Sequence, residues 1–85
     1  MGKVLATIKV MPDGLEVDIN KLEEEIKQKI NPERIDKQPI AFGLVALIVE
    51  KVIADDEGEI EKVENVLKSI EGVSSIEVTN LTRLL

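Results

Sequence analysis

Apolar and polar residues alternate along residues 3–11, and this period of two predicts a β-strand. Turn-forming residues at positions 12–14 end the strand. From Asp18 onward the apolar residues recur every three or four positions, which predicts an amphipathic helix that Asp18 caps and Asn31-Pro32 ends. The inward stripe of this helix consists of Ile19, Leu22, Ile26 and Ile30.

The rest of the chain predicts two strands, a second helix and a last strand. A short strand is expected over residues 34–40, where Pro39 marks an edge or a bulge. In the next strand, residues 43–54, positions 44–49 are apolar on both faces, as in a central strand or one whose second face a partner covers. An acidic connection, residues 55–58, leads to a helix with its C-terminal cap at Gly72. The stripe of this second helix is Ile60, Val63, Leu67 and Ile70, and the last strand runs from Val73 to about Leu81.

The predicted order is therefore β-α-β-β-α-β within a single domain, residues 1–85. The first and third strands are the most apolar, which favours central positions, and the second and fourth are expected at the edges. This order predicts an α+β fold, the ferredoxin-like plait: a four-stranded antiparallel sheet with two helices on one face.

The composition narrows the chemistry that the chain can perform. The 85 residues include no Cys and no His, which excludes a disulfide framework, a zinc finger, an imidazole base and a Cys–His nucleophile. The net charge is −6 and Phe42 is the only aromatic residue, so direct binding of nucleic acid is not expected. The longest apolar run, residues 40–49, is about half of the ~20 residues that a membrane span needs. The amino terminus lacks the apolar segment of a signal peptide, and we expect a cytoplasmic protein.

Neither the acidic residues nor the glycines form a catalytic or ligand-binding motif. Residues 55–57 are consecutive acids, but nothing places two carboxyl groups across a cleft, and the spacing does not match a calcium-binding loop. A solvated loop that caps the second helix is the favoured interpretation. The scattered glycines form no phosphate-binding loop. We expect no catalytic, cofactor-binding or metal-binding residues.

Two places remain as candidate interaction sites. Phe42 lies where the chain turns between two strands, and it is either a core residue or an exposed anchor for a protein partner, with Gly43 allowing close approach. The carboxyl-terminal segment, residues 81–85, carries three leucines and one cation at the end of an acidic chain. It either docks onto a partner or packs as a strand end on its own domain.

Three segments carry a family resemblance. Residues 39–47, Pro-Ile-Ala-Phe-Gly-Leu-Val-Ala-Leu, are similar to the motif Pro-x-Gly-[Tyr/Phe]-Gly-Ile-[Lys/Arg]-Lys-Leu. Residues 10–12 with residues 18–23 are similar to V-K-P…D-x-x-x-L-E, and residues 73–84 to V-Q-S-x-D-I-A-A-[Phe/Met]-x-K-[Ile/Leu]. These motifs belong to the exchange-factor domain of translation elongation factor 1-beta, and the chain most resembles the archaeal stand-alone form.

The resemblance implies guanine-nucleotide exchange on elongation factor 1-alpha, the GTPase that carries aminoacyl-tRNA, without covalent chemistry and therefore without enzymatic catalysis. It implies partner contacts at Phe42 in the turn and at Arg83 near the chain end, and we expect Gly43, Leu81 and Thr82 beside them to contact the partner as well. The cation of Arg83 would reach the magnesium and phosphate region of the nucleotide site and compete with Mg²⁺ for its ligands. The chain departs from the pattern in having Arg instead of Lys at position 83, and no cations at positions 45 and 46.

Two other functions stay open on the residues alone. Plaits of this shape often pair edge to edge and bind small molecules, such as amino acids, between them. An RNA-binding plait is the weaker alternative, because the central strands carry no aromatic ladder and the net charge is negative.

Overall fold

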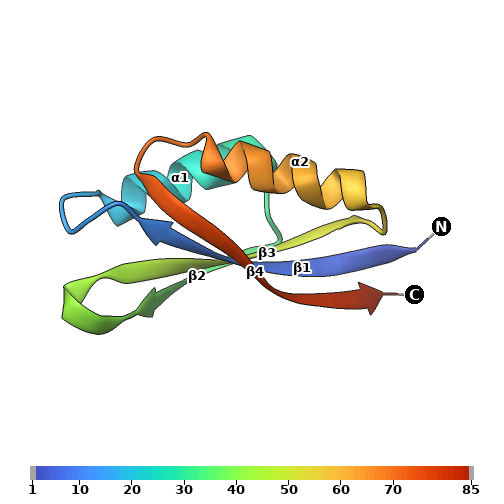
Figure 1. The fold of residues 1–85 in the computed structure, drawn as a ribbon, viewed down its shortest axis with the longest axis horizontal. Helices are drawn as coiled ribbons and strands as arrows, with labels where there is room; N and C mark the ends of the chain where they lie inside the picture. The colour runs from blue at the N-terminus through green and yellow to red at the C-terminus, as the bar shows by residue number, and fades with distance from the viewer. Residues whose placement is uncertain (1, 85) are drawn as a thin grey trace.

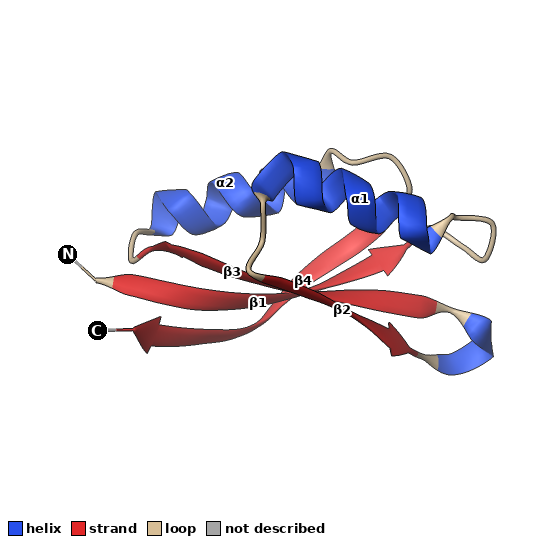
Figure 2. Cartoon of the chain, turned by 180° about the vertical axis from the view of Figure 1, so that it is seen from behind, coloured by secondary structure: helices blue, strands red, loops and turns tan. Residues whose placement is uncertain are grey.

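The computed structural model describes residues 2–84 of the chain. The elements are β1 (Lys3–Pro12), α1 (Ile19–Ile30), β2 (Arg34–Pro39), a 3₁₀ turn η1 (Ala41–Gly43), β3 (Val45–Ala54), α2 (Glu57–Lys68) and β4 (Val73–Leu84). The strands form one antiparallel sheet in the order β2-β3-β1-β4, and both helices cover the same face of it (Figure 1, Figure 2). The predicted ferredoxin-like plait is confirmed, with β1 and β3 in the centre.

The hydrophobic core lies between the sheet and the helices. Alternate residues of β1 point into it, and Ile8 and Val10 are fully buried opposite Val49 and Leu47 of β3. From the helices, the predicted stripes supply Leu22 and Ile26 of α1 and Val63 and Leu67 of α2. The other face of β3 carries Ile48 and Val52, which are half-buried although neither helix covers them. The strand order confirms that β3 is central, which was one interpretation of its two apolar faces.

The second helix differs from its prediction at both ends. It begins at Glu57, because Asp56 is the N-cap and its carboxylate accepts a hydrogen bond of 2.8 Å from the backbone N–H of Gly58. It ends at Lys68, where the Ser69 hydroxyl donates to the carbonyl of Val66 at 2.6 Å. The prediction that Gly72 caps this helix is wrong: Gly72, with φ +97°, lies in the turn that follows. Ile70 is buried, but from that turn.

Strand boundaries also shift. β4 extends to Leu84 instead of Leu81, because its ladder with β1 continues through the pairs Arg83–Val4 and Leu84–Lys3. β3 begins at Val45 and not at position 43, since η1 occupies the connection from β2. Pro39 is the last residue of the edge strand β2, and the Asp18 cap of α1 is confirmed by hydrogen bonds from the N–H groups of Asn20 (3.1 Å) and Lys21 (3.2 Å).

The molecule is elongated along the strands, with extents of 42 × 21 × 17 Å. We call one end the loop end, formed by residues 13–17 and 40–44, and the other the strand end, formed by residues 2–3, 54–56 and 83–84. They lie at the left and right of Figure 1, respectively. No helix within residues 2–84 combines the length and the apolar character that crossing a membrane requires.

Candidate partner-binding surfaces

The loop end presents Phe42 to solvent. The hairpin between β2 and β3 is closed by a hydrogen bond of 2.8 Å from the Ile40 N–H to the Leu44 carbonyl, with a second from the Leu44 N–H to the Ala41 carbonyl at 3.3 Å. Phe42 is at its tip and 92 % exposed. The interpretation of Phe42 as a core residue is therefore wrong, because the hairpin projects past the ends of both helices and the core lies elsewhere (Figure 2).

The backbone at this tip is strained. Phe42 adopts φ 64° and ψ 28°, the left-handed region, which costs a residue with a Cβ about 1–2 kcal/mol. The side chain gains nothing from burial that would offset this cost within the protein itself. Such an outlier, observed at an exposed aromatic residue, is a reason to infer a role in recognition.

Gly43 follows Phe42 with φ +79°, a conformation that favours glycine. A Cβ placed on it would lie 3.5 Å from Leu15 Cδ2, so the loop between β1 and α1 reaches across to the hairpin. Leu15 is itself 69 % exposed. We missed Leu15 in the sequence, where its signal was one apolar residue inside a turn of Asp, Gly and Glu.

The strand end presents a cation. Arg83 Nη2 lies 3.1 Å from Asp55 Oδ2, and the arginine side chain remains 77 % exposed. The backbone N–H of Asp55 donates to the Gly2 carbonyl at 3.1 Å, which ties the connection between β3 and α2 to the start of β1. The guanidinium is therefore held beside a carboxylate at the tip of the molecule while most of it stays accessible.

The predicted carboxyl-terminal contact residues do not share one face. Leu81 and Arg83 point to the helix side of the sheet, because their partners in β1 are the core residues Ala6 and Val4. Thr82 lies opposite Leu5 and points to the uncovered side. Leu81 is 48 % exposed at the sheet edge. Leu85, also part of the predicted segment, lies outside the described residues.

Phe42 and Arg83 are at opposite ends of the molecule. The hairpin joins β3 at Val45, whereas Arg83 lies level with the other end of that strand, since Leu84 and Ala54 both pair with Lys3. Ten residues of strand at ~3.3 Å each place these two ends about 30 Å apart. The two predicted contacts therefore cannot form one compact site.

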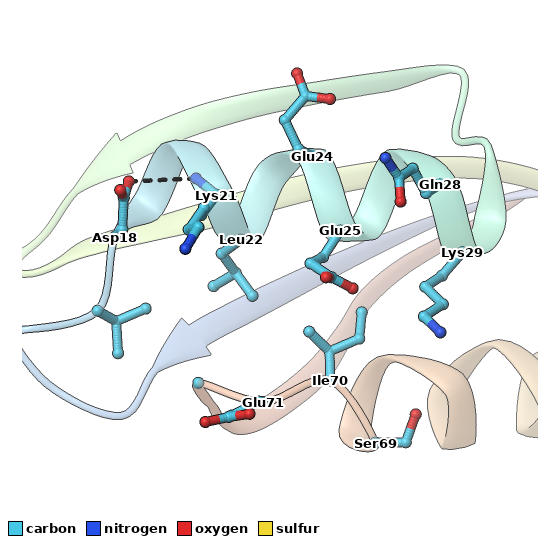
Figure 3. Close-up of a pocket in the computed structure, with 12 residues that line it drawn as sticks. Asp18, Lys21, Leu22, Glu24, Glu25, Gln28, Lys29, Ser69, Ile70 and Glu71 are labelled. Carbon is cyan, nitrogen blue, oxygen red and sulfur yellow. Dashed lines mark hydrogen bonds between the residues drawn. The ribbon is translucent and has the colours of Figure 1, made fainter.

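A groove of about 650 Å³ separates α1 from the turn after α2, and it borders the loop end at Val17 (Figure 3). Leu22 and Ile70 point toward one another inside it, and charges of both signs surround it, including Lys21, Lys29 and Glu71. No predicted site residue lines this groove. Across residues 2–84, no three acidic side chains converge as metal ligands would.

Comparison with known proteins identifies the family of the chain that carries these surfaces. The family model described as the EF-1 guanine nucleotide exchange domain matches residues 5–84. The chain belongs to this family. The match includes residues of all four strands, the hairpin with Phe42 and Arg83 at the strand end.

Archaeal proteins named elongation factor 1-beta resemble the chain over essentially their whole length. The protein of Methanothermobacter thermautotrophicus is 53 % identical, and that of Methanosphaera stadtmanae 43 % identical, each with both chains fully covered. The protein of Thermoplasma acidophilum is 40 % identical over 96 % of this chain and 98 % of its own. The resemblance found in the sequence motifs is thereby confirmed, and the chain is an exchange-domain protein with a GTPase partner.

Membership in the exchange-domain family agrees with the kind of surface that each end offers. An exchange factor contacts a partner and changes that partner's affinity for nucleotide, which requires anchors and charges but no catalytic group of its own. An exposed aromatic residue and an exposed cation are residues of this kind. The family match also favours nucleotide exchange over the small-molecule-sensing and RNA-binding alternatives.

Proposed function

We propose that this protein, as a single domain of residues 1–85, accelerates the release of GDP from elongation factor 1-alpha and its replacement by GTP during translation elongation in the cytoplasm. The family match over residues 5–84 is the observation that carries the proposal. The protein acts without covalent chemistry, since the reaction it promotes is the exchange of one bound nucleotide for another.

Acceleration follows from binding the nucleotide-free GTPase more tightly than the nucleotide-bound GTPase. Because coupling between two ligands is reciprocal, a factor that loses affinity when nucleotide binds also weakens nucleotide binding by the same ratio. The factor therefore needs one contact that does not depend on the nucleotide and another that competes with it or its metal ion.

The two ends supply these two kinds of contact. Phe42 is an aromatic anchor, and burying it in the partner supplies affinity without reference to the nucleotide. Arg83 brings a positive charge to the magnesium and phosphate region of the nucleotide site. There the guanidinium competes with Mg²⁺ for acidic and phosphate ligands and loosens the metal and then the nucleotide.

Gly43, Leu81 and Thr82 complete the proposed contact set in supporting roles. Gly43 adopts the positive φ of the hairpin tip beside Phe42, with its open side toward Leu15. Leu81 flanks Arg83 on the same side of the sheet, and Thr82 faces the opposite side. A separation of about 30 Å between the ends means that the partner contacts the long side of the molecule, so that both are engaged at once.

The test is the release of a fluorescent GDP analogue from the cognate elongation factor 1-alpha in an excess of unlabelled nucleotide. We expect this protein at micromolar concentration to increase the release rate well above the spontaneous rate. Heat-denatured protein at the same concentration is the control. An unchanged release rate with the folded protein would refute the proposed function.

A further inference from the structure

Exposed apolar residues gather at the loop end. Within residues 2–84, three large apolar side chains are exposed: Leu15, Phe42 and Leu81. The first two are far apart in the sequence, yet both belong to the loop end: the loop between β1 and α1 and the hairpin lie at the same end of the molecule (Figure 1), and Leu15 reaches toward Gly43. Isolated exposed leucines need no explanation, but a leucine that reaches toward Gly43, the residue after the chain's single aromatic side chain, does.

Leu15 lies in a loop that is fixed by contacts with the rest of the protein. Its Cδ2 atom lies over Gly43, the residue after Phe42, and a small hollow of about 40 Å³ separates the loop from the hairpin at this point. The loop is closed by a hydrogen bond of 3.3 Å from the Val17 N–H to the Gly14 carbonyl and is joined to Gly72 by a bond of 2.8 Å from the Asp13 N–H. The leucine therefore projects from a loop fixed by hydrogen bonds, and more than half of the residue's surface is still accessible.

The surroundings of Leu15 are acidic. Asp13 and Glu16 flank it, both are exposed, and the Glu16 carboxylate folds back over Gly14. An apolar side chain with carboxylates around it is complementary to an apolar pocket with lysine or arginine at its rim.

We propose that Leu15 is a second apolar anchor for the GTPase, beside Phe42, and that the two enter an apolar surface of the partner bordered by basic residues. This inference rests on the proposed function and adds a segment, residues 13–16, that nothing in the family resemblance pointed to. Leu15 supplies affinity through its own contact with the partner, and Asp13 and Glu16 increase the association rate by charge attraction.

The experiment measures the dissociation constant for nucleotide-free elongation factor 1-alpha with Leu15→Ala, Phe42→Ala and the double variant. We expect Leu15→Ala to weaken binding about tenfold, as the loss of a contributing anchor does. We expect a further loss when Leu15→Ala is added to Phe42→Ala. Val66→Ala is the control: Val66 is a half-buried residue of α2 that is not part of the hydrophobic core, and its loss should leave binding unchanged.

Two outcomes would overturn the inference. Parental affinity in Leu15→Ala would show that the leucine makes no contact with the partner. An effect of Leu15→Ala that disappears in the Phe42→Ala background would show that it only supports the hairpin. In either case the unmodified protein still accelerates GDP release, so failure here is distinct from failure of the proposed function. Thermal unfolding should stay within about 3 °C of the parent protein, because Leu15 is largely exposed.

The role of the acidic residues beside Leu15 is tested separately. Glu16→Lys should lower the association rate constant several-fold at low ionic strength, and added salt should reduce the difference. Glu61→Lys, at an exposed position of α2, changes the net charge equally and is the matched control. Equal rates for the two variants would contradict a basic rim opposite residues 13–16.

Discussion

The two ends of this molecule differ in almost every physical respect. The loop end exposes two large apolar side chains, Leu15 and Phe42, beside the acids Asp13 and Glu16, and the strained backbone of Phe42 is offset by no burial within the chain. The strand end is charged, its backbone is regular antiparallel sheet, and its cation already has a carboxylate partner. An exposed ion pair contributes little to stability, whereas an aromatic residue moved from water into a pocket contributes a great deal to affinity.

This difference predicts that the two ends have different roles in nucleotide exchange. The loop end is suited to holding the GTPase, because burial of apolar surface does not depend on whether nucleotide is present. The strand end is suited to acting on the nucleotide site, because charge acts on metal and phosphate. If the account is correct, variants at the two ends change different measured quantities.

The largest effect is expected from Phe42→Ala. Removal of a central aromatic anchor should weaken binding to nucleotide-free elongation factor 1-alpha by about 2 kcal/mol or more, since such anchors dominate interfaces. Titration calorimetry or fluorescence anisotropy measures this change. If this variant bound with the affinity of the parent protein, the loop end would not be part of the interface, and the contrast between the two ends would fail.

Arg83→Ala should have a smaller effect, and mainly on rate. We expect the maximal rate of GDP release to fall about tenfold, equivalent to about 1.4 kcal/mol of barrier, while the affinity for the nucleotide-free GTPase changes less. Stopped-flow release at saturating factor concentration measures the rate. Arg83→Lys keeps the charge and should recover part of it. A variant that loses affinity but keeps the maximal rate would reverse the assignment.

Phe42→Asn separates strain from function at the loop end. Asparagine tolerates the left-handed region better than phenylalanine does, so the free energy of unfolding should rise by up to about 1 kcal/mol. Exchange activity should nevertheless fall as in Phe42→Ala. Urea unfolding measured beside GDP release tests both parts. Reduced stability would show that the phenylalanine ring supports the hairpin, contrary to its exposure.

The smallest effect is expected from Asp55→Asn at the strand end. The ion pair with Arg83 is largely exposed, so its loss should change the free energy of unfolding by less than about 1 kcal/mol. The difference from the parent protein should shrink further as salt is added. A larger, salt-independent loss would mean that the Asp55 carboxylate supports the fold through more than its ion pair with Arg83.

Much of the fold could be predicted from the sequence, because the two helix stripes and the alternation in β1 are periodic signals that burial imposes. The end of α2 could not, since Ser69 stops the helix through a local hydrogen bond while Ile70 remains buried and continues the stripe. The end of β4 was also misplaced, because residues 82–84 show no apolar alternation and belong to the sheet through their pairing with β1.

The candidate site was less predictable than the fold. Phe42 and Arg83 could be identified by resemblance, but their separation follows from strand register, which the sequence does not display. Whether Phe42 was buried also depended on where the hairpin projects. Leu15 was missed because its contact with Gly43 joins two loops that are remote in the sequence.

The most direct test of the account is the dependence of the GDP-release rate on factor concentration for the parent protein, Phe42→Ala and Arg83→Ala. The account predicts that Phe42→Ala raises the half-saturating concentration with a similar plateau, and that Arg83→Ala lowers the plateau at a similar half-saturating concentration. The account would be contradicted if the two variants changed the same parameter equally. It would also be contradicted if the parent protein left GDP release at its spontaneous rate.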